Sequence, residues 1–304
     1  MRLGIVSNVV IDEIATEDGN AVWDLGGPPC YCGLTARRFK LQVSLATRVG
    51  HDFSDEYVKF FENSGLELAD FRTAESRTTS FKLQYDADGE RQLYLKSNCG
   101  QVRPRDIDSL KADAWLVSPV YDEVPNQTLS RVKEASKAVD GSVMLDPQGY
   151  LRSADSDGRI TMASATNLDL AGIDIVKADQ TELRILTGGL CGLEGMESLR
   201  SKGIGTVLAT EHRQVSLLHE ETLYWVKIRD IKASDTTGAG DILSSAFICA
   251  LLKEDDPLWA LCFGAGALTA ALESGRKGID KIPEMAKIEQ NASYFYNSVG
   301  FKKL

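Results

Sequence analysis

Several hallmarks of metal, nucleotide and membrane chemistry are missing from this 304-residue chain. It contains no apolar run long enough to span a bilayer and no G-x-x-x-x-G-K-[ST] phosphate loop. Its three histidines stand at no metal-ligand spacing, and its six cysteines form no C-x-x-C pair. Cys30 and Cys32 flank one tyrosine, but no further ligands for a metal accompany them. We therefore expect six reduced cysteines that are mostly buried.

The balance of charged and apolar residues narrows the class of protein. A net charge of −10 argues against a dedicated nucleic-acid partner or an anionic membrane partner, although one local site can still hold a phosphate. With 43% hydrophobic residues, the chain can bury a real core. Asp12 and Glu13 interrupt the apolar beginning too early for a secretory signal, so the expected location is the cytoplasm.

From about residue 114 the sequence alternates between strand and helix patterns. Short apolar strands are predicted over 114–119, 142–147 and 172–178, and helices over 126–139 and 179–188. Repeated units of this kind predict an α/β fold with a mostly parallel central sheet and helices on both of its faces. No internal repeat or long linker divides the chain, so we expect a single domain over residues 1–304.

Two polar hairpin patterns stand apart from this scheme. Asp18-Gly19 separates two short β-prone segments, and Asp88-Gly89 separates strands with alternating apolar and polar residues. Segments near 10–25 and 78–98 are therefore expected to form a small antiparallel β appendage, inserted in the domain, that can act as a lid. Because a sheet with an apolar face can pair with its twin, such a lid also suggests a homodimer.

The stretch DTTGAGD, over residues 235–241, lies between a predicted strand and an apolar helix. Gly238, Ala239 and Gly240 would begin that helix, and glycine lets the backbone turn tightly and a ligand approach the amides. The N–H groups of a first helical turn and the helix dipole attract an anion. The stretch therefore predicts a phosphate site.

Asp241 falls in the first turn of the same helix, beside the expected phosphate. One interpretation is a helix-terminal acid that the dipole stabilises by roughly 0.3–1 kcal/mol. The other is a base that takes a proton from a hydroxyl attacking phosphorus, which also implies Mg²⁺ to offset the like charges. The residues alone leave both interpretations open. A second Gly-x-Gly, at 264–266, lies inside an apolar helical run, where close packing explains it better than a nicotinamide site.

DTTGAGD also resembles, over all seven residues, the C-terminal signature of the ribokinase family, the PfkB carbohydrate kinases. Four other segments resemble motifs of that family, so the resemblance extends over most of the chain. They are LGGPPCYCGLTARRF, TRVGHDFSDEYVKFFENSGL with Ser54 at a usual glycine, KADQTEL with Asp179 at the asparagine of an N-x-x-E motif, and DPQGYLR. The last segment is similar to archaeal-type and inositol-kinase-like branches.

The resemblance implies Mg²⁺- and ATP-dependent phosphorylation of a hydroxyl on a sugar, polyol or nucleoside, and it leaves a monovalent cation open. It makes Asp241 the catalytic base and the amides of residues 238–240 the anion hole. It places Glu182 on Mg²⁺ through water, with Asp179 beside it. These roles favour the second interpretation of Asp241.

The resemblance also assigns contacts to the two substrates. Nucleotide contacts fall on Asp179, Glu182, Thr210 and Thr237, with His212 at the glycine of the family's T-x-G turn. Contacts to the small-molecule substrate fall on four positions: Asp12, Gly26, Gly27 and Arg152. Without the resemblance, Asp12 would cap a turn, Glu182 would lie on a helix surface, and Arg152 would be solvated.

Other functions stay open beside the sugar or polyol kinase. They are a nucleoside kinase of the same family, a non-catalytic sugar or nucleotide sensor on the same fold, and a dehydrogenase. DPQGYLR and GGPPCY favour inositol or a neutral sugar as the substrate. A phosphosugar needs a basic cluster, which Arg77, Lys82 and Lys96 near the lid can supply, although alternating lysines on a hairpin more often face solvent.

Overall fold

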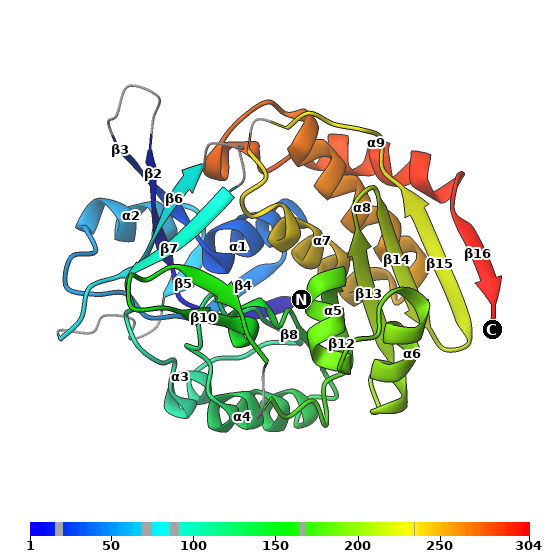
Figure 1. The fold of residues 1–304 in the computed structure, drawn as a ribbon, viewed down its shortest axis with the longest axis horizontal. Coiled ribbons are helices and arrows are strands. Elements are labelled where there is room, and N and C mark those ends of the chain that lie inside the picture. Colours follow the sequence, from blue (N-terminus) through cyan, green and yellow to red (C-terminus); the bar gives the residue numbers. More distant parts are fainter. Residues whose placement is uncertain (16–20, 69–74, 86–90, 165–167, 234) are drawn as a thin grey trace.

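The computed structural model describes residues 1–304 except 16–20, 69–74, 86–90, 165–167 and 234 (Figure 1). A ten-stranded sheet runs through it. In order across the sheet, its strands are β16 (Gly300–Lys303), β15 (Thr222–Lys227), β14 (Gln214–His219), β13 (Thr206–Glu211), β12 (Ile175–Asp179), β9 (Ser142–Leu145), β8 (Ala114–Val117), β1 (Arg2–Val6), β4 (Gln42–Ala46) and β5 (Leu66–Leu68). All pairings from β5 to β13 are parallel, and those from β13 to β16 are antiparallel. The predicted mostly parallel sheet is confirmed.

Helices cover both faces of this sheet, as predicted. One face carries α1 (Pro28–Arg38), α2 (Asp55–Asn63), α7 (Ala239–Glu254), α8 (Pro257–Glu273) and α9 (Met285–Tyr296). The other carries α3 (Pro104–Asp108), α4 (Asn126–Lys137), α5 (Gln180–Thr187) and α6 (Gly192–Ser201). Along β8, Ala114 and Leu116 pack into the first core, while Trp115 and Val117 pack into the second. Because side chains of a strand alternate between faces, a strand buried on both sides is apolar throughout.

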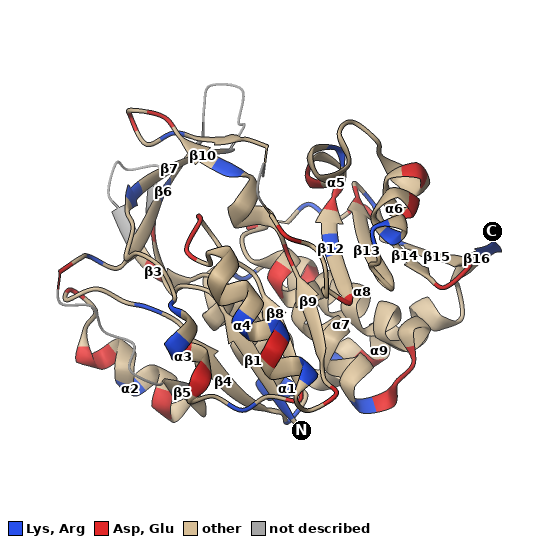
Figure 2. Ribbon diagram, turned by 90° about the horizontal axis from the view of Figure 1, so that it is seen from below, with Lys and Arg blue, Asp and Glu red and all other residues tan. Residues whose placement is uncertain are grey.

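A second sheet has four strands, in the order β3 (Ala21–Gly26), β2 (Val10–Ala15), β6 (Thr79–Tyr85) and β7 (Arg91–Ser97). Each predicted hairpin is antiparallel, and the two hairpins join through a parallel pairing of β2 with β6. The predicted turns Asp18-Gly19 and Asp88-Gly89 lie outside the described residues. Figure 2 shows β6 and β7 on one side and α5 on the other, above strands of the main sheet.

The sequence patterns do not predict the short and terminal elements. These are β5, α3, α9, β16 and a two-stranded sheet of β10 (Arg152–Ala154) and β11 (Ile160–Met162). Within the part of the chain that the structure describes, no helix is both long and apolar enough to cross a membrane. All six cysteines are free and five are buried, as expected.

Candidate active site

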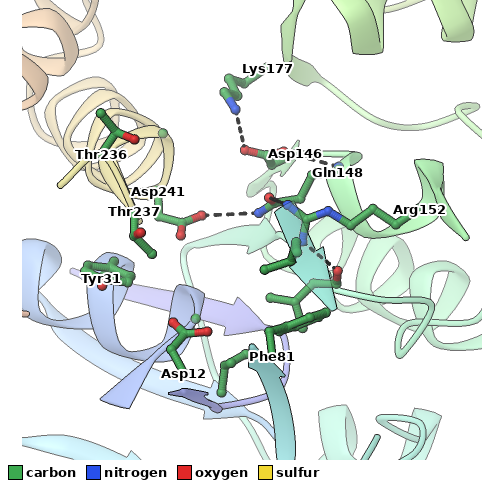
Figure 3. A pocket seen from close by; sticks show the side chains of 16 residues that line it. Asp12, Tyr31, Phe81, Asp146, Gln148, Arg152, Lys177, Thr236, Thr237 and Asp241 are labelled. Atoms are coloured by element: carbon green, nitrogen blue, oxygen red, sulfur yellow. Dashed lines mark hydrogen bonds and ion pairs between the residues drawn. The ribbon is translucent and has the colours of Figure 1, made fainter. Parts of the chain in front are cut away.

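A cavity of about 200 Å³ lies at the carboxyl ends of the parallel strands, between the main sheet and the four-stranded sheet (Figure 3). In open α/β sheets this edge is the usual place for a ligand. Seven residues proposed from the sequence line it: Asp12, Gly27, Arg152, Thr237, Gly238, Gly240 and Asp241. Five others are not part of its lining: Gly26, Asp179, Glu182, Thr210 and Ala239.

The start of α7 forms one wall of the cavity. Gly238 has φ 71°, in the left-handed region, and a Cβ there would lie 2.4 Å from the ring of Tyr31, so glycine is required. Gly240 faces Lys177, whose Nζ lies 3.2 Å from the place that a Cβ would take. The backbone amides and the dipole of the first turn thus lie beside the ammonium group of Lys177. Together these positive groups form an arrangement that can bind a phosphate.

An ion pair holds the loop that leads into α7. Lys281 Nζ lies 2.6 Å from Asp235 Oδ2 and donates to the carbonyl oxygen of Thr237 at 2.7 Å. The Asp235 carboxylate also accepts from the amides of Thr237 at 2.8 Å and Gly278 at 2.9 Å. Burial raises the pKa of Asp235, but these hydrogen bonds outweigh burial and bring it below its usual value. The first aspartate of DTTGAGD is therefore an anchor that fixes the turn into α7.

Asp241 points into the cavity from the first turn of α7 and is 8% exposed (Figure 3). Its Oδ1 accepts a hydrogen bond from Gln148 Nε2 at 3.5 Å. Burial and then the charge of Asp146 raise its pKa to about 7, against the opposing charge of Lys177. A carboxylate that titrates near neutral pH is suited to accept a proton from a hydroxyl.

A buried ion pair that the sequence patterns did not single out lies close to Asp241. Lys177 of β12 donates to Asp146, which directly follows β9, with 2.9 Å between Nζ and Oδ2, and their side chains are 9% and 1% exposed. Burial lowers the pKa of Lys177, but the charges of Asp146 and Glu182 outweigh burial and raise it above its usual value. Lys177 is therefore a permanent cation in the cavity wall. The signal for it was a lone lysine inside an apolar strand pattern.

Asp179 and Glu182 form a capping box at the start of α5. Asp179 Oδ1 accepts from the amides of Thr181 and Glu182, both at 2.8 Å, and Glu182 Oε2 accepts from the amide of Asp179 at 2.7 Å. Burial raises the pKa of Glu182 to about 7, although the charge of Lys177 opposes this. Thr210 is the neighbour of Asp179 on β13. These residues stand at the strand ends next to the cavity.

A second wall comes from the four-stranded sheet and the turn into α1. Asp12 on β2 is buried, and its Oδ2 lies 2.5 Å from the place that a Cβ on Gly26 would take. Gly27 has φ 78°, and a Cβ there would lie 2.9 Å from the carbonyl oxygen of Asn8. The double glycine therefore makes room for the Asp12 carboxylate and lets α1 begin at Pro28. Apolar side chains complete this wall: Val10, Phe81, Leu93 and Val120.

Arg152 links this apolar wall to the side of the cavity that holds Asp241. It donates from Nη1 to the carbonyl oxygen of Val120 and from Nη2 to Oε1 of Gln148, both at 2.9 Å. The second bond holds the amide of Gln148 so that its Nε2 faces Asp241 (Figure 3). Gln148 is thus a further site residue, inside the DPQGYLR segment, that the sequence patterns did not single out.

A model of the pfkB family carbohydrate kinases matches residues 11–282 of this chain. The chain is 23% identical to the fructokinase of Vibrio alginolyticus over 265 residues, which are 84% of this chain and 85% of the relative. It is 25% identical to the 1-phosphofructokinase of Haloferax volcanii over 282 residues, which are 90% of this chain and 87% of the relative.

Solved structures share the fold. A pyrophosphate-dependent kinase in the ribokinase family, complexed with a pyrophosphate analog and myo-inositol, matches with a TM-score of 0.80 and 20% identity, covering 95% of this chain and 99% of that chain. The fructokinase of Vibrio cholerae O395 in a form with fructose, ADP and calcium ion bound matches with a TM-score of 0.77 and 18% identity, covering 96% and 98%. The ribokinase-like fold implied by the sequence is confirmed.

Proposed function

Because the chain belongs to the pfkB family of carbohydrate kinases, and is therefore a phosphotransferase acting on a sugar or polyol hydroxyl, we propose that it uses ATP with Mg²⁺ and that Asp241 is its base. Membership of this family excludes the dehydrogenase function that the sequence alone left open. The observation that carries the proposal is the place of Asp241. Its carboxylate, with a pKa of about 7, stands between the phosphate site at α7 and the wall that holds Asp12.

Two parts of the site act on different groups in this proposal. The amides at the start of α7 and the Lys177 ammonium stabilise the negative charge of the transferred phosphoryl group. Asp241 accepts the proton of the acceptor hydroxyl. Aspartate is a weak base for an alcohol, but in a loose phosphoryl-transfer transition state the proton moves late, so a positioned carboxylate suffices. Most of the rate then comes from placement and fixed charge.

Mg²⁺ fits this site as a companion of the donor phosphates. In proteins it keeps several waters and binds through one or two carboxylates plus substrate phosphates. Consistent with that mode, no group of three or more His, Cys, Asp or Glu side chains among the described residues could hold an ion by itself. Glu182 would hold the ion through water, with Asp179 beside it. The ion would neutralise charge on the donor phosphates.

The chain acts as one domain in this proposal, and the four-stranded sheet from segments near 10–25 and 78–98 is its lid. Asp12 and Phe81 on this sheet line the cavity, so closure of the sheet would exclude water that otherwise hydrolyses the donor. Pairing of two lids in a homodimer is supported by β3, an edge strand on which Trp23 is 52% exposed.

Pyrophosphate is a second candidate donor. One structural relative is pyrophosphate-dependent, and in this chain Lys177 brings a permanent positive charge directly to the start of α7. A small donor without an adenosine group depends on such charge for most of its binding.

Release of ADP from MgATP, and of phosphate from pyrophosphate, over a panel of sugars, polyols and nucleosides tests the proposal. We expect turnover of at least one acceptor with ATP and its loss when Mg²⁺ is chelated. Binding of acceptor and donor without release of either product would indicate a non-catalytic sensor and contradict the proposal. Turnover with pyrophosphate alone would replace ATP as the donor. A K⁺ titration in the same assay shows whether a monovalent cation is required.

A further inference from the structure

The two faces of the lid sheet carry different chemistry. Val10, Asp12, Phe81 and Leu93 line the cavity from one face. The residues next to them in sequence point the other way, because side chains of a strand alternate. That outer face lines a second hollow on the far side of the sheet, with Ile11, Glu13, Ser80 and Lys96 in its wall.

Three basic residues of the lid region whose side chains the structure describes, Arg77, Lys82 and Lys96, belong to the outer face. Lys82 is the register partner of Glu13, and their side chains form an ion pair at 3.7 Å. Arg77 lines the outer hollow, where it pairs with Asp52 at 3.1 Å, and Lys96 lines the same hollow. The basic cluster that a phosphosugar would need is therefore turned away from the cavity. Among the described residues of the lid, those that line the cavity offer an acceptor one carboxylate and apolar surface.

The lining of the cavity includes two cations, and each is engaged by other groups of the protein. Lys177 is bound to Asp146 and lies against Gly240 at the start of α7. Arg152 donates to the carbonyl oxygen of Val120 and to Gln148. A phosphate on the part of the acceptor that faces Asp12 would lie beside a carboxylate, where like charges repel.

The wall that contains Asp12 is suited to an acceptor with uncharged hydroxyl groups. A carboxylate has two oxygens and accepts hydrogen bonds from two adjacent hydroxyl groups, and Asp12 presents such a carboxylate. Phe81, Val10 and Leu93 suit the C–H face of a sugar ring. The cavity of about 200 Å³ is below the roughly 300–1,000 Å³ of pockets for drug-sized ligands, which favours a single ring over a nucleoside.

We propose that the acceptor is an uncharged monosaccharide or cyclic polyol, and that the lid excludes phosphorylated sugars and nucleosides. This inference rests on the proposed kinase function and narrows it. The chain is 23% identical to a fructokinase and 25% identical to a 1-phosphofructokinase. Sequence identity therefore does not choose between these two activities, whereas the inference does.

The test compares fructose, ribose and myo-inositol with fructose 1-phosphate, fructose 6-phosphate and adenosine, with ATP and with pyrophosphate as donors. We expect kcat/KM for at least one neutral ring to exceed that of every charged or nucleoside acceptor by about a hundredfold or more. A phosphosugar or adenosine as the best acceptor overturns the inference and leaves the kinase function standing.

If no acceptor is turned over, binding of the same acceptors, measured as a shift in the melting temperature of the protein, tests the inference. We then expect a neutral ring to raise the melting temperature and the phosphosugars and adenosine to leave it unchanged. That result would count against the proposed donor chemistry and support the acceptor class. A shift with phosphosugars or adenosine alone, or with none of the neutral rings, overturns the inference.

Neighbouring residues on opposite faces of β2 provide matched variants. Asp12→Asn should raise KM for the neutral acceptor about tenfold to a hundredfold, keep KM for the donor, and weaken discrimination against phosphosugars. Glu13→Gln, one residue further on the outer face, should leave all three unchanged. Equal effects of the two substitutions, or full discrimination retained in Asp12→Asn, contradict the role of the inner face.

Discussion

Two Gly-Ala-Gly segments of this chain have the same composition and opposite surroundings. Residues 238–240 begin α7 at the edge of the cavity, whereas residues 264–266 lie inside α8. A Cβ on Gly264 would lie 3.2 Å from the carbonyl oxygen of Leu243 in α7. A Cβ on Gly266 would lie 2.9 Å from the amide nitrogen of Ala292 in α9. The inner segment lets three helices approach closely, and the outer one places a helix end in the wall of the cavity.

The comparison shows that position decides what glycine contributes. Inside α8 every backbone amide can bond within the helix, so the missing side chain serves packing alone. At the start of α7 the amide of Ala239 donates to the carbonyl oxygen of Thr236 at 3.2 Å, but the first turn still lies at a helix end, where amides lack the partners of a helix interior. Lys177 and Asp241 lie beside this turn. The predictions below contrast the two places.

The largest effect is expected for the acid at the start of α7. Asp241→Asn should lower kcat by about 10³–10⁴-fold, because the base is lost while shape is kept. The matched change at the start of α8 is Asp256→Asn, where the side chain caps the amides of Leu258 and Trp259 and asparagine caps equally well. Steady-state kinetics should show kcat unchanged there. An Asp241→Asn enzyme with normal kcat would remove the base assignment.

A smaller loss of rate, with a loss of stability, is expected at the buried ion pair. Lys177→Met should lower kcat by about 10²–10³-fold and the free energy of unfolding by about 3–5 kcal/mol, because Asp146 is left charged and buried. Adding Asp146→Asn should recover stability in denaturant titrations without recovering rate. If rate returns together with stability, Lys177 has only a structural role.

Substitution of one glycine in each segment should change either the stability or the rate, but not both. In Gly266→Ala the new methyl meets backbone atoms, so the free energy of unfolding should fall by about 1–3 kcal/mol with kcat unchanged. In Gly240→Ala the methyl meets the flexible end of Lys177 at 3.2 Å, so stability should hold. Its kcat/KM should fall about tenfold because Lys177 moves. The same outcome for both variants would abolish the contrast between the two segments.

Activity and stability should depend on pH with opposite sign. Since Asp241 has a pKa of about 7, kcat/KM should rise about tenfold per pH unit up to that pH and then level off. Unfolded Asp241 titrates at its usual 3.8, so between the two values the folded protein binds more protons, and its stability falls as pH rises. Burial of Glu182 acts in the same direction.

Asp241→Asn isolates the contribution of Asp241 to this pH profile. The stability difference between wild type and variant should change between about pH 4 and 7 and be constant above. Melting curves across that range measure it. A pH-independent difference would show that Asp241 titrates at its ordinary value in the folded protein.

Local patterns were enough to predict the main strands, the hairpins and the start of α7, because apolar alternation and glycine act over a few residues. They could not predict the pair of Lys177 and Asp146, whose contact depends on β9 and β12 being neighbours in the sheet. The spacing of Asp179 and Glu182 fits both a metal motif and a capping box, and only coordinates show the capping box. Ser54, at a usual glycine of the family, caps α2 through its side chain.

The order of strands in the main sheet has a consequence for how the molecule matures. β1 lies in the middle of that sheet, between β4 and β8, and the cavity also needs β2, β9, β12 and α7. Contacts between residues so far apart in sequence form late in folding, after many chain segments have been brought together. In refolding, activity should therefore return after secondary structure. Under the proposed mechanism, an incomplete nascent chain that ends before α7 would lack both the base and the phosphate site, so it would neither phosphorylate an acceptor nor hydrolyse the donor.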